Sequence, residues 1–148
     1  MLYRRGSAIS KRCACVQRKL TNGAARLPDG MRPVFGTESL APAAVELPSE
    51  AVLSLDFSAV GFLGGPSWLT ACRSWPTRVI CMTMAAVGSG AGPQIDTIRA
   101  VLDRAEGRDV YAAGGVRHAD DLETLARQGC AGALVATALH DGRIGALY

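Results

Sequence analysis

Three stretches of this sequence place glycine and other small residues directly after an apolar run, where a helical pattern begins. They read AAVGSGAGP (85–93), AAGGV (112–116) and LVATALHDG (134–142). Glycine lets the backbone approach a ligand closely, and helix N-termini present N–H groups without an intrahelical partner. The stretches therefore predict loops that bind an anion such as phosphate, or glycines that only turn the chain. The residues concerned are Gly88, Ser89, Gly90, Gly114, Gly115, Ala136 and Thr137.

Asp56 is a carboxylate at the end of the apolar run VLSL (52–55). Burial at that position would raise its pKa into a range useful for general acid–base catalysis. A structural carboxylate, hydrogen-bonded to neighbouring loop amides, is an equally good interpretation of the pattern. His118 and His140 have no partner at a catalytic spacing, so both are predicted to pack or to face solvent.

The composition excludes several other kinds of site. The run GSGAG (88–92) lacks the glycine spacing of a dinucleotide-binding loop. Five cysteines, an odd number, lie at spacings that predict neither a zinc site nor a disulfide framework. No metal or cofactor is expected, and free cysteines favour the cytoplasm. Aromatic residues make up only 5% of the chain, which argues against base stacking. No apolar run approaches the roughly 18 residues of a membrane span.

The elements that would position these residues alternate along the chain. Apolar runs typical of strands buried on both faces occur at 33–36, 51–57, 78–84, 109–115 and 132–138. Helical patterns occur at 93–107 and 118–129, with a weaker one of about two turns at 66–75. Strands and helices that alternate in this way predict an α/β fold with a parallel sheet. The carboxyl ends of such strands are where function gathers.

Residues 1–30 differ from the rest of the chain. Residues 1–32 hold eight Lys or Arg and one acidic residue, without a clear strand or helix period. We interpret residues 1–30 as a basic, disordered segment, because blocks of like charge usually stay solvated. A transit peptide or an arm that touches nucleic acid remain alternatives, the latter supported by charge alone. The folded domain is therefore expected over residues 31–148.

The C-terminal part of the chain resembles a known family. AAGGVRHADDLETLARQGCAGALVATALHDGRI (112–144) resembles the seventh and eighth strands of the histidine-biosynthesis (β/α)8 barrels. That family contains the phosphoribosylformimino-aminoimidazole-carboxamide ribotide isomerase and the cyclase subunit of imidazole glycerol phosphate synthase. RPVFGTESL (32–40) and AVLSLDF (51–57) resemble its fourth and fifth strands, and VICMTMAAVGSGAGP (79–93) resembles the sixth more loosely. The resemblance covers about residues 31–145.

The resemblance implies the C-terminal half of a TIM barrel, about strands four to eight. It implies Asp56 as general acid or base, phosphate contacts from Gly114, Gly115, Ala136 and Thr137, and a substrate loop containing Thr83, Gly88, Ser89 and Gly90. The implied reaction is an Amadori-type isomerisation of a phosphorylated ribotide, without metal or redox cofactor. A half-barrel would need a second copy, or another chain, to complete it.

Departures from the family pattern are equally informative. Val87 stands where the family has an aspartate, and Met82 aligns with an expected threonine, although Thr83 is adjacent. The first-strand acid–base residue has no counterpart in the chain. We therefore expect a diverged isomerase-like paralogue. The alternative is a truncated, inactive half-barrel that binds a phosphorylated ligand or serves as an oligomer partner.

Overall fold

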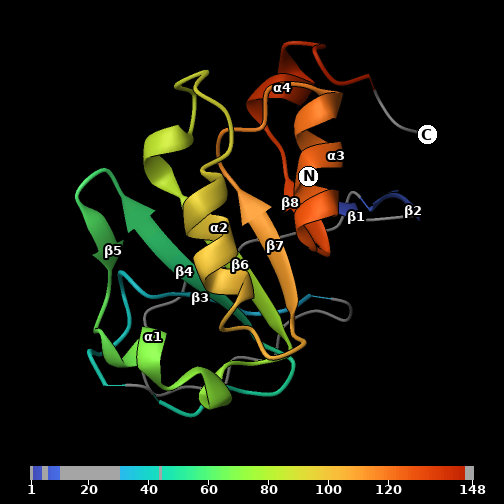
Figure 1. Cartoon of the computed structure of the whole chain (residues 1–148). Coiled ribbons are helices and arrows are strands. Elements are labelled where there is room, and N and C mark those ends of the chain that lie inside the picture. Colours follow the sequence, from blue (N-terminus) through green and yellow to red (C-terminus); the bar gives the residue numbers. More distant parts are fainter. Residues whose placement is uncertain (1, 5–6, 11–30, 44, 146–148) are drawn as a thin grey trace.

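Five adjacent parallel strands make up most of one sheet, in the order in which they occur along the chain (Figure 1). The computed structural model describes residues 2–4, 7–10, 31–43 and 45–145. The parallel strands are β3 (Val34–Gly36), β4 (Val52–Ser58), β6 (Arg78–Thr83), β7 (Asp109–Ala113) and β8 (Gly132–Leu134). The predicted α/β class with a parallel sheet is confirmed.

Two features of the sheet differ from the sequence-based expectation. The chain turns back after β4 to form β5 (Gly61–Leu63), which pairs antiparallel with it and places Leu63 opposite Asp56. No strand was predicted there. The last strand was predicted over 132–138 but ends at Leu134, because the chain then turns into α4 (Thr137–His140).

Helices follow the strands, but the one predicted over 93–107 is shorter than expected and ends at Leu102. The longest are α2 (Ile95–Leu102) and α3 (Ala119–Gln128), and Gly129 ends α3 in the left-handed conformation. The weak pattern at 66–75 becomes one short helix, α1 (Ser67–Thr70), followed by the 3₁₀ turn η1 (Cys72–Ser74). A second 3₁₀ turn, η2 (Met84–Ala86), follows β6.

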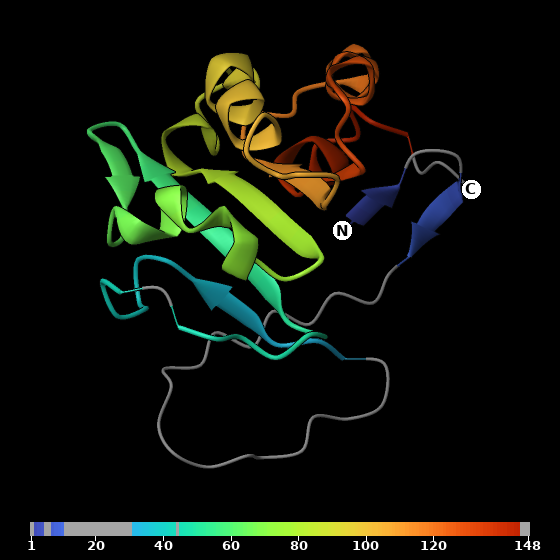
Figure 2. The same cartoon turned by 60° about the horizontal axis from the view of Figure 1, so that its bottom comes forward.

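The main core lies between the sheet and the helices. Both α2 and α3 pack on one face of the sheet (Figures 1 and 2). Their buried side chains meet alternate residues of the strands, and the fully buried Trp68 of α1 joins the same cluster. The core side chains from these elements are Ile98, Val101, Leu122, Leu125, Leu53, Leu55, Val79, Cys81, Val110 and Ala112.

The opposite face of the sheet carries a second, smaller cluster, in which Ile80, Tyr111 and Ala113 are buried. Asp56, Met82, Ala113 and Leu134 are paired in register across β4, β6, β7 and β8. Residues paired in this way project to the same face, so Asp56 shares this second face with the three apolar side chains.

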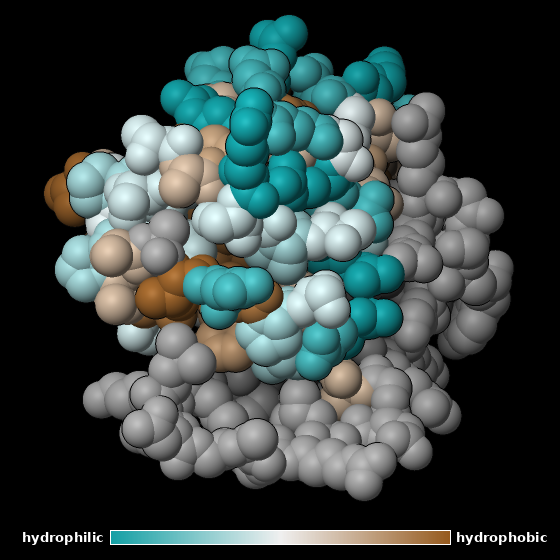
Figure 3. All heavy atoms as spheres, turned by 90° about the horizontal axis from the view of Figure 1, so that it is seen from below, coloured by the Kyte–Doolittle hydropathy of each residue, from teal (hydrophilic) through white to brown (hydrophobic). Residues whose placement is uncertain are grey.

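Seen from below, the described surface is a mixture of hydrophilic and intermediate side chains with small apolar patches (Figure 3).

The N-terminal segment is described in part. Leu2–Arg4 (β1) and Ser7–Ser10 (β2) form an antiparallel pair, and β1 runs antiparallel to β8. No sequence pattern predicted these two strands. The expectation of disorder over 1–30 falls mostly on residues 1, 5–6 and 11–30, outside the described part, and it stays a prediction. Within the described residues, no helix has the length and apolarity required to span a bilayer.

Candidate functional site

The three predicted loops meet around one cavity of about 520 Å³ at the carboxyl end of the sheet. Each of the three predicted loops contributes residues to its lining, namely Gly88, Ser89, Gly90, Gly114, Gly115, Ala136 and Thr137, whereas Gly92 of the first loop does not line it. Met82, Ala113 and Leu134, which lie in one row across β6, β7 and β8, also line it. The spacing in the sequence therefore identified a set of residues that the fold brings together.

Gly114 and Gly115 are required by packing, whatever they bind. Both adopt positive φ, 99° and 81°. A Cβ on Gly114 would lie 2.4 Å from the carbonyl oxygen of Thr83, and one on Gly115 would lie 2.3 Å from that of Gly92. These distances are far shorter than a normal contact, so only glycine fits. The two interpretations of the Gly-Gly pair, tight turn and ligand contact, are compatible.

Gly88 and Gly90 differ from that pair. Both have positive φ, about 70°, but a Cβ on either would meet nothing within 4 Å. Their loop therefore has open space around its tip, while its end at Gly92 is held against Gly115.

Arg117 supplies a cation to the cavity. Its guanidinium donates to both carboxylate oxygens of Asp121, at 3.0 and 2.9 Å, and its backbone N–H donates to the same carboxylate at 2.8 Å. The hydrogen bonds from Arg117 hold the pKa of Asp121 below its ordinary value. Arg117 is thus fixed in place at the start of α3, with its guanidinium beside Gly92. Neither residue was predicted as part of the site.

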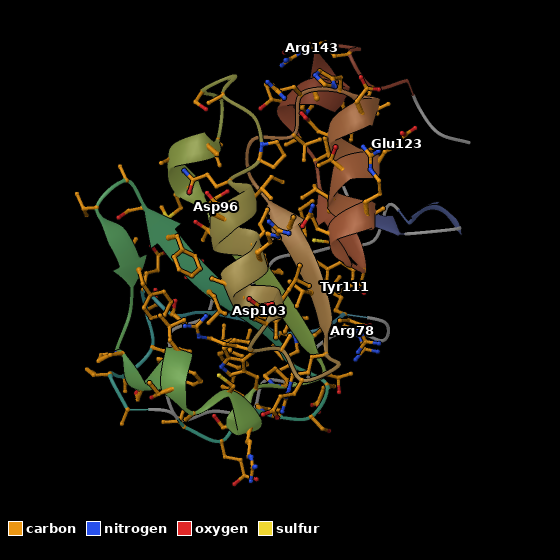
Figure 4. The ribbon with its side chains drawn as sticks, viewed as in Figure 1. Arg78, Asp96, Asp103, Tyr111, Glu123 and Arg143 are labelled. Atoms are coloured by element: carbon orange, nitrogen blue, oxygen red, sulfur yellow. The ribbon has the colours of Figure 1, made fainter. Side chains whose placement is uncertain are left out.

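Arg143 is the second cation of the lining. Figure 4 shows it beside α4, at the opposite end of the sheet from Arg78. Its guanidinium donates to Asp141 at 2.7 Å, and both side chains are about half exposed. Because exposed ion pairs contribute little to stability, Arg143 can turn to a bound anion at small cost.

Asp56 lies one strand away from this cavity and does not line it. Its carboxylate, in a residue only 5% exposed, accepts hydrogen bonds from the Ser54 hydroxyl at 2.7 Å and the Glu38 N–H at 3.3 Å. It is turned toward β3, where a Cβ on Gly36 would lie 2.8 Å from Oδ2. Burial raises the pKa of Asp56 above its ordinary value of 3.8, against the opposing hydrogen bonds.

Thr83, predicted in the substrate loop, also lies outside the lining. It is fully buried and its hydroxyl donates to the Ala113 carbonyl at 3.0 Å, which braces the turn at Gly114. The neighbouring Met82 lines the cavity instead, since successive side chains of a strand point to opposite faces.

The remaining candidates lie apart from the cavity. His118 and His140 are exposed and neither lines it. In the part of the chain that the structure describes, no group of three His, Cys, Asp or Glu is arranged to hold a metal ion.

Comparison with known proteins gives one family and several relatives. The family described as histidine biosynthesis protein matches residues 13–145. An uncharacterized protein of Methanocaldococcus jannaschii is 30% identical over 75% of this chain and 49% of its own length. A phosphoribosyl imidazole-4-carboxamide isomerase of Flavobacterium johnsoniae is 38% identical over 45% of this chain and 28% of its own. Phosphoribosyl isomerase A of Mycobacterium avium is 38% identical over 48% and 30%, respectively. The chain thus spans about half or less of these relatives.

Proposed function

The chain belongs to the histidine biosynthesis protein family, and on that premise we propose that it binds a phosphorylated small molecule and acts as an isomerase. The observation that carries the proposal is the cavity, because two glycine-containing loops and the segment that follows β8 line it at the carboxyl end of a parallel sheet. That end of a βα array is where ligands of such folds bind.

The phosphate would lie between the loops that follow β7 and β8. Gly114 and Gly115 line the cavity without side chains, and Ala136 and Thr137, at the start of α4, line the same cavity. Arg143 would exchange its exposed partner Asp141 for the phosphate. No metal is required for this mode of binding.

The proposed reaction is an Amadori-type isomerisation of a ribotide, with Asp56 as general acid or base. Opening a ribose ring needs a proton at the ring oxygen, and forming the ketose needs a proton removed from the adjacent carbon. A carboxyl with a raised pKa suits such transfers near neutral pH. Asp56 shares a face and a register row with Met82 of the cavity, so a rotation away from β3 would bring it toward the ligand.

We further propose that β3, β4, β6, β7 and β8 correspond to about strands four to eight of a (β/α)8 barrel. Their consecutive parallel order supports this assignment. A second copy of the chain or another chain would complete the barrel, and the antiparallel β1 would have to leave the edge of β8 if pairing used that edge. For a biosynthetic family we expect the cytoplasm as the compartment.

A non-catalytic phosphate-ligand binder or oligomer partner is the second candidate. The observation that favours it is the lining itself, in which the described residues include no carboxylate and no histidine. Without a second acid–base group, the ribotide would bind and not react.

Asp56→Asn tests the catalytic proposal. We expect the variant to isomerise the phosphoribosyl imidazole-4-carboxamide substrate at least about 100-fold more slowly, the usual loss for a general acid–base residue. As a base Asp56 must be ionised, so the wild-type rate should fall with decreasing pH, through a pKa above 3.8. Chromatographic separation of substrate and product gives the rates.

Asp96→Asn is the matched control, because Asp96 is exposed at the start of α2 and should leave the rate unchanged. An unchanged rate in Asp56→Asn would exclude the catalytic role. No turnover by the wild type, with phosphate still bound, would favour the non-catalytic candidate.

A further inference from the structure

We propose, resting on the isomerase function proposed above, that Ser54 is a positioning residue for the reaction: its hydroxyl orients the Asp56 carboxylate and favours the ionised form that acts as a base. Ser54 lies two residues before Asp56 on β4. Side chains of a strand alternate between its faces, so these two lie on the same face. The Ser54 hydroxyl donates to Oδ1 of Asp56 at 2.7 Å, and both residues are buried.

The surroundings of Ser54 give its hydroxyl no other role. Its cross-strand neighbours are Gly36 on β3 and Ile80 on β6, and neither has a side chain that forms hydrogen bonds. Burying a hydroxyl costs free energy unless it finds a partner. The partner that the structure provides is the Asp56 carboxylate. The hydroxyl therefore acts on that carboxylate, and an apolar side chain would serve the packing of this face equally well.

The other carboxylate oxygen is held from β3. The Glu38 N–H donates to Oδ2 at 3.3 Å, and a Cβ on Gly36 would lie 2.8 Å from the same oxygen. Thr37 ties the two strands together, because its N–H donates to the Ser54 carbonyl at 2.9 Å and its hydroxyl accepts from the Asp56 N–H at 3.0 Å. With one donor on each oxygen, the carboxylate has a defined orientation. Of these two donors, only the Ser54 hydroxyl can be removed by a side-chain substitution.

The hydrogen bond from Ser54 opposes two effects that favour the protonated acid. Burial raises the pKa of Asp56, and the charge of Glu38 raises it further, whereas the hydrogen bonds from Ser54 and the backbone lower it. A hydrogen bond donated to a carboxylate stabilises the ionised form over the neutral acid. Ser54 thus extends to lower pH the range in which Asp56 can accept a proton.

The strands beside Asp56 bring it no positive charge. Its cross-strand partners are Leu63 on β5 and Met82 on β6, and both are uncharged. Burial raises the pKa of the neighbouring Cys81 thiol to about 12, so this thiol stays neutral while Asp56 titrates. Among the side chains around Asp56, Ser54 is therefore the one that most favours its ionisation.

A pH titration of the Asp56 carboxyl carbon, followed by ¹³C NMR, tests the inference without any substrate. The spectrum of Asp56→Asn identifies the signal. In Ser54→Ala we expect the midpoint to lie at higher pH than in the wild type, because the ionised form has lost a donor. Ser54→Thr keeps a hydroxyl on the same carbon and should restore the wild-type midpoint.

The rate of isomerisation should change with pH in the same direction. As a base Asp56 must be ionised, and kcat/KM reports the pKa of the free chain. At a pH below both midpoints, kcat/KM of Ser54→Ala should be about tenfold lower than that of the wild type, the usual effect of a hydrogen bond to a charged group. Above both midpoints the two values should converge. A hydroxyl with a structural role alone would change the rate equally at every pH.

Ser58→Ala is the matched control. Ser58 lies two residues after Asp56 on the same face of β4, but its hydroxyl donates to the Gly61 carbonyl at 3.1 Å. Neither the midpoint of Asp56 nor the pH dependence of the rate should change in this variant.

The outcomes separate this inference from the proposed function. An unchanged Asp56 midpoint in Ser54→Ala, or a loss of kcat/KM that is equal at every pH, would overturn the role of Ser54 and leave the isomerase proposal standing. A midpoint that moves to higher pH, with no turnover by the wild type, would confirm that Ser54 acts on the carboxyl and would exclude the isomerase.

Discussion

Replacing Gly115 with alanine is expected to destabilise the protein by about 3 kcal/mol or more and to abolish phosphate binding. The residue has a φ of 81°, which costs an alanine roughly 1–2 kcal/mol. Its new Cβ would also lie 2.3 Å from the Gly92 carbonyl oxygen, and overpacking of this kind adds about 1–3 kcal/mol. Urea denaturation gives the loss of stability, and titration with phosphate gives the loss of binding.

Gly88→Ala is the matched control for this effect. Its φ of 71° is similar, but a Cβ there would meet nothing within 4 Å. It should therefore show the conformational cost alone, roughly 1–2 kcal/mol. Equal losses in the two variants would mean that the contact between Gly115 and Gly92 does not hold the cavity together.

Replacing Trp68 with alanine is expected to cost about 3–5 kcal/mol, the usual loss for a buried tryptophan. Its ring is fully buried in the main core, and its indole N–H donates to the Ala41 carbonyl at 3.0 Å. That bond holds the segment after β3, whose Thr37 hydroxyl and Glu38 N–H contact Asp56. The substitution should therefore also loosen the surroundings of Asp56. Urea denaturation measures the first effect.

Trp68→Phe separates the two contributions. It keeps most of the ring and removes the hydrogen bond, so a loss of about 1 kcal/mol is expected. If Trp68→Phe were as stable as the wild type, the hydrogen bond to Ala41 would not anchor the segment. In that case the hydrogen bonds to Asp56 must be held by other contacts.

The parallel strands could be predicted because runs such as VLSL (52–55) are apolar throughout and long enough to identify. The hairpin strand β5 could not, since Gly61–Leu63 is too short to show any period and lies among glycines. Its pairing with β4 depends on tertiary contact. The hydrophobic pattern of the sequence and its turn residues do not specify such an element.

The positions of the glycines predicted the loops of the site. They did not predict the directions in which the side chains of the strands point. A strand buried on both faces has no alternation to show that Met82 faces the cavity and Thr83 the helices. The turn of Asp56 toward β3 depends on the missing Cβ of Gly36, a residue 20 positions earlier. Such a contact leaves no local signal.

The sequence contains a pattern that could have placed Arg117 and Asp121 together. Their spacing of four residues at the start of α3 is that of a helical ion pair. The acidic residues of this turn also fit the positive end of the helix dipole, which explains them without a partner. Asp121, the third residue of α3, is buried in the structure. Its burial favours the ion pair with Arg117 over an interaction with the helix dipole alone.

The measurement that most directly tests the central claim is the titration of the ¹⁵N-labelled chain with inorganic phosphate, followed by NMR. If the cavity binds phosphate, the largest amide shifts should occur together near Gly114–Val116 and near Ala136–Ala138, with one common dissociation constant. No saturable shift in either loop, or saturable shifts confined to surfaces away from the cavity, would contradict a phosphate site between β7 and β8.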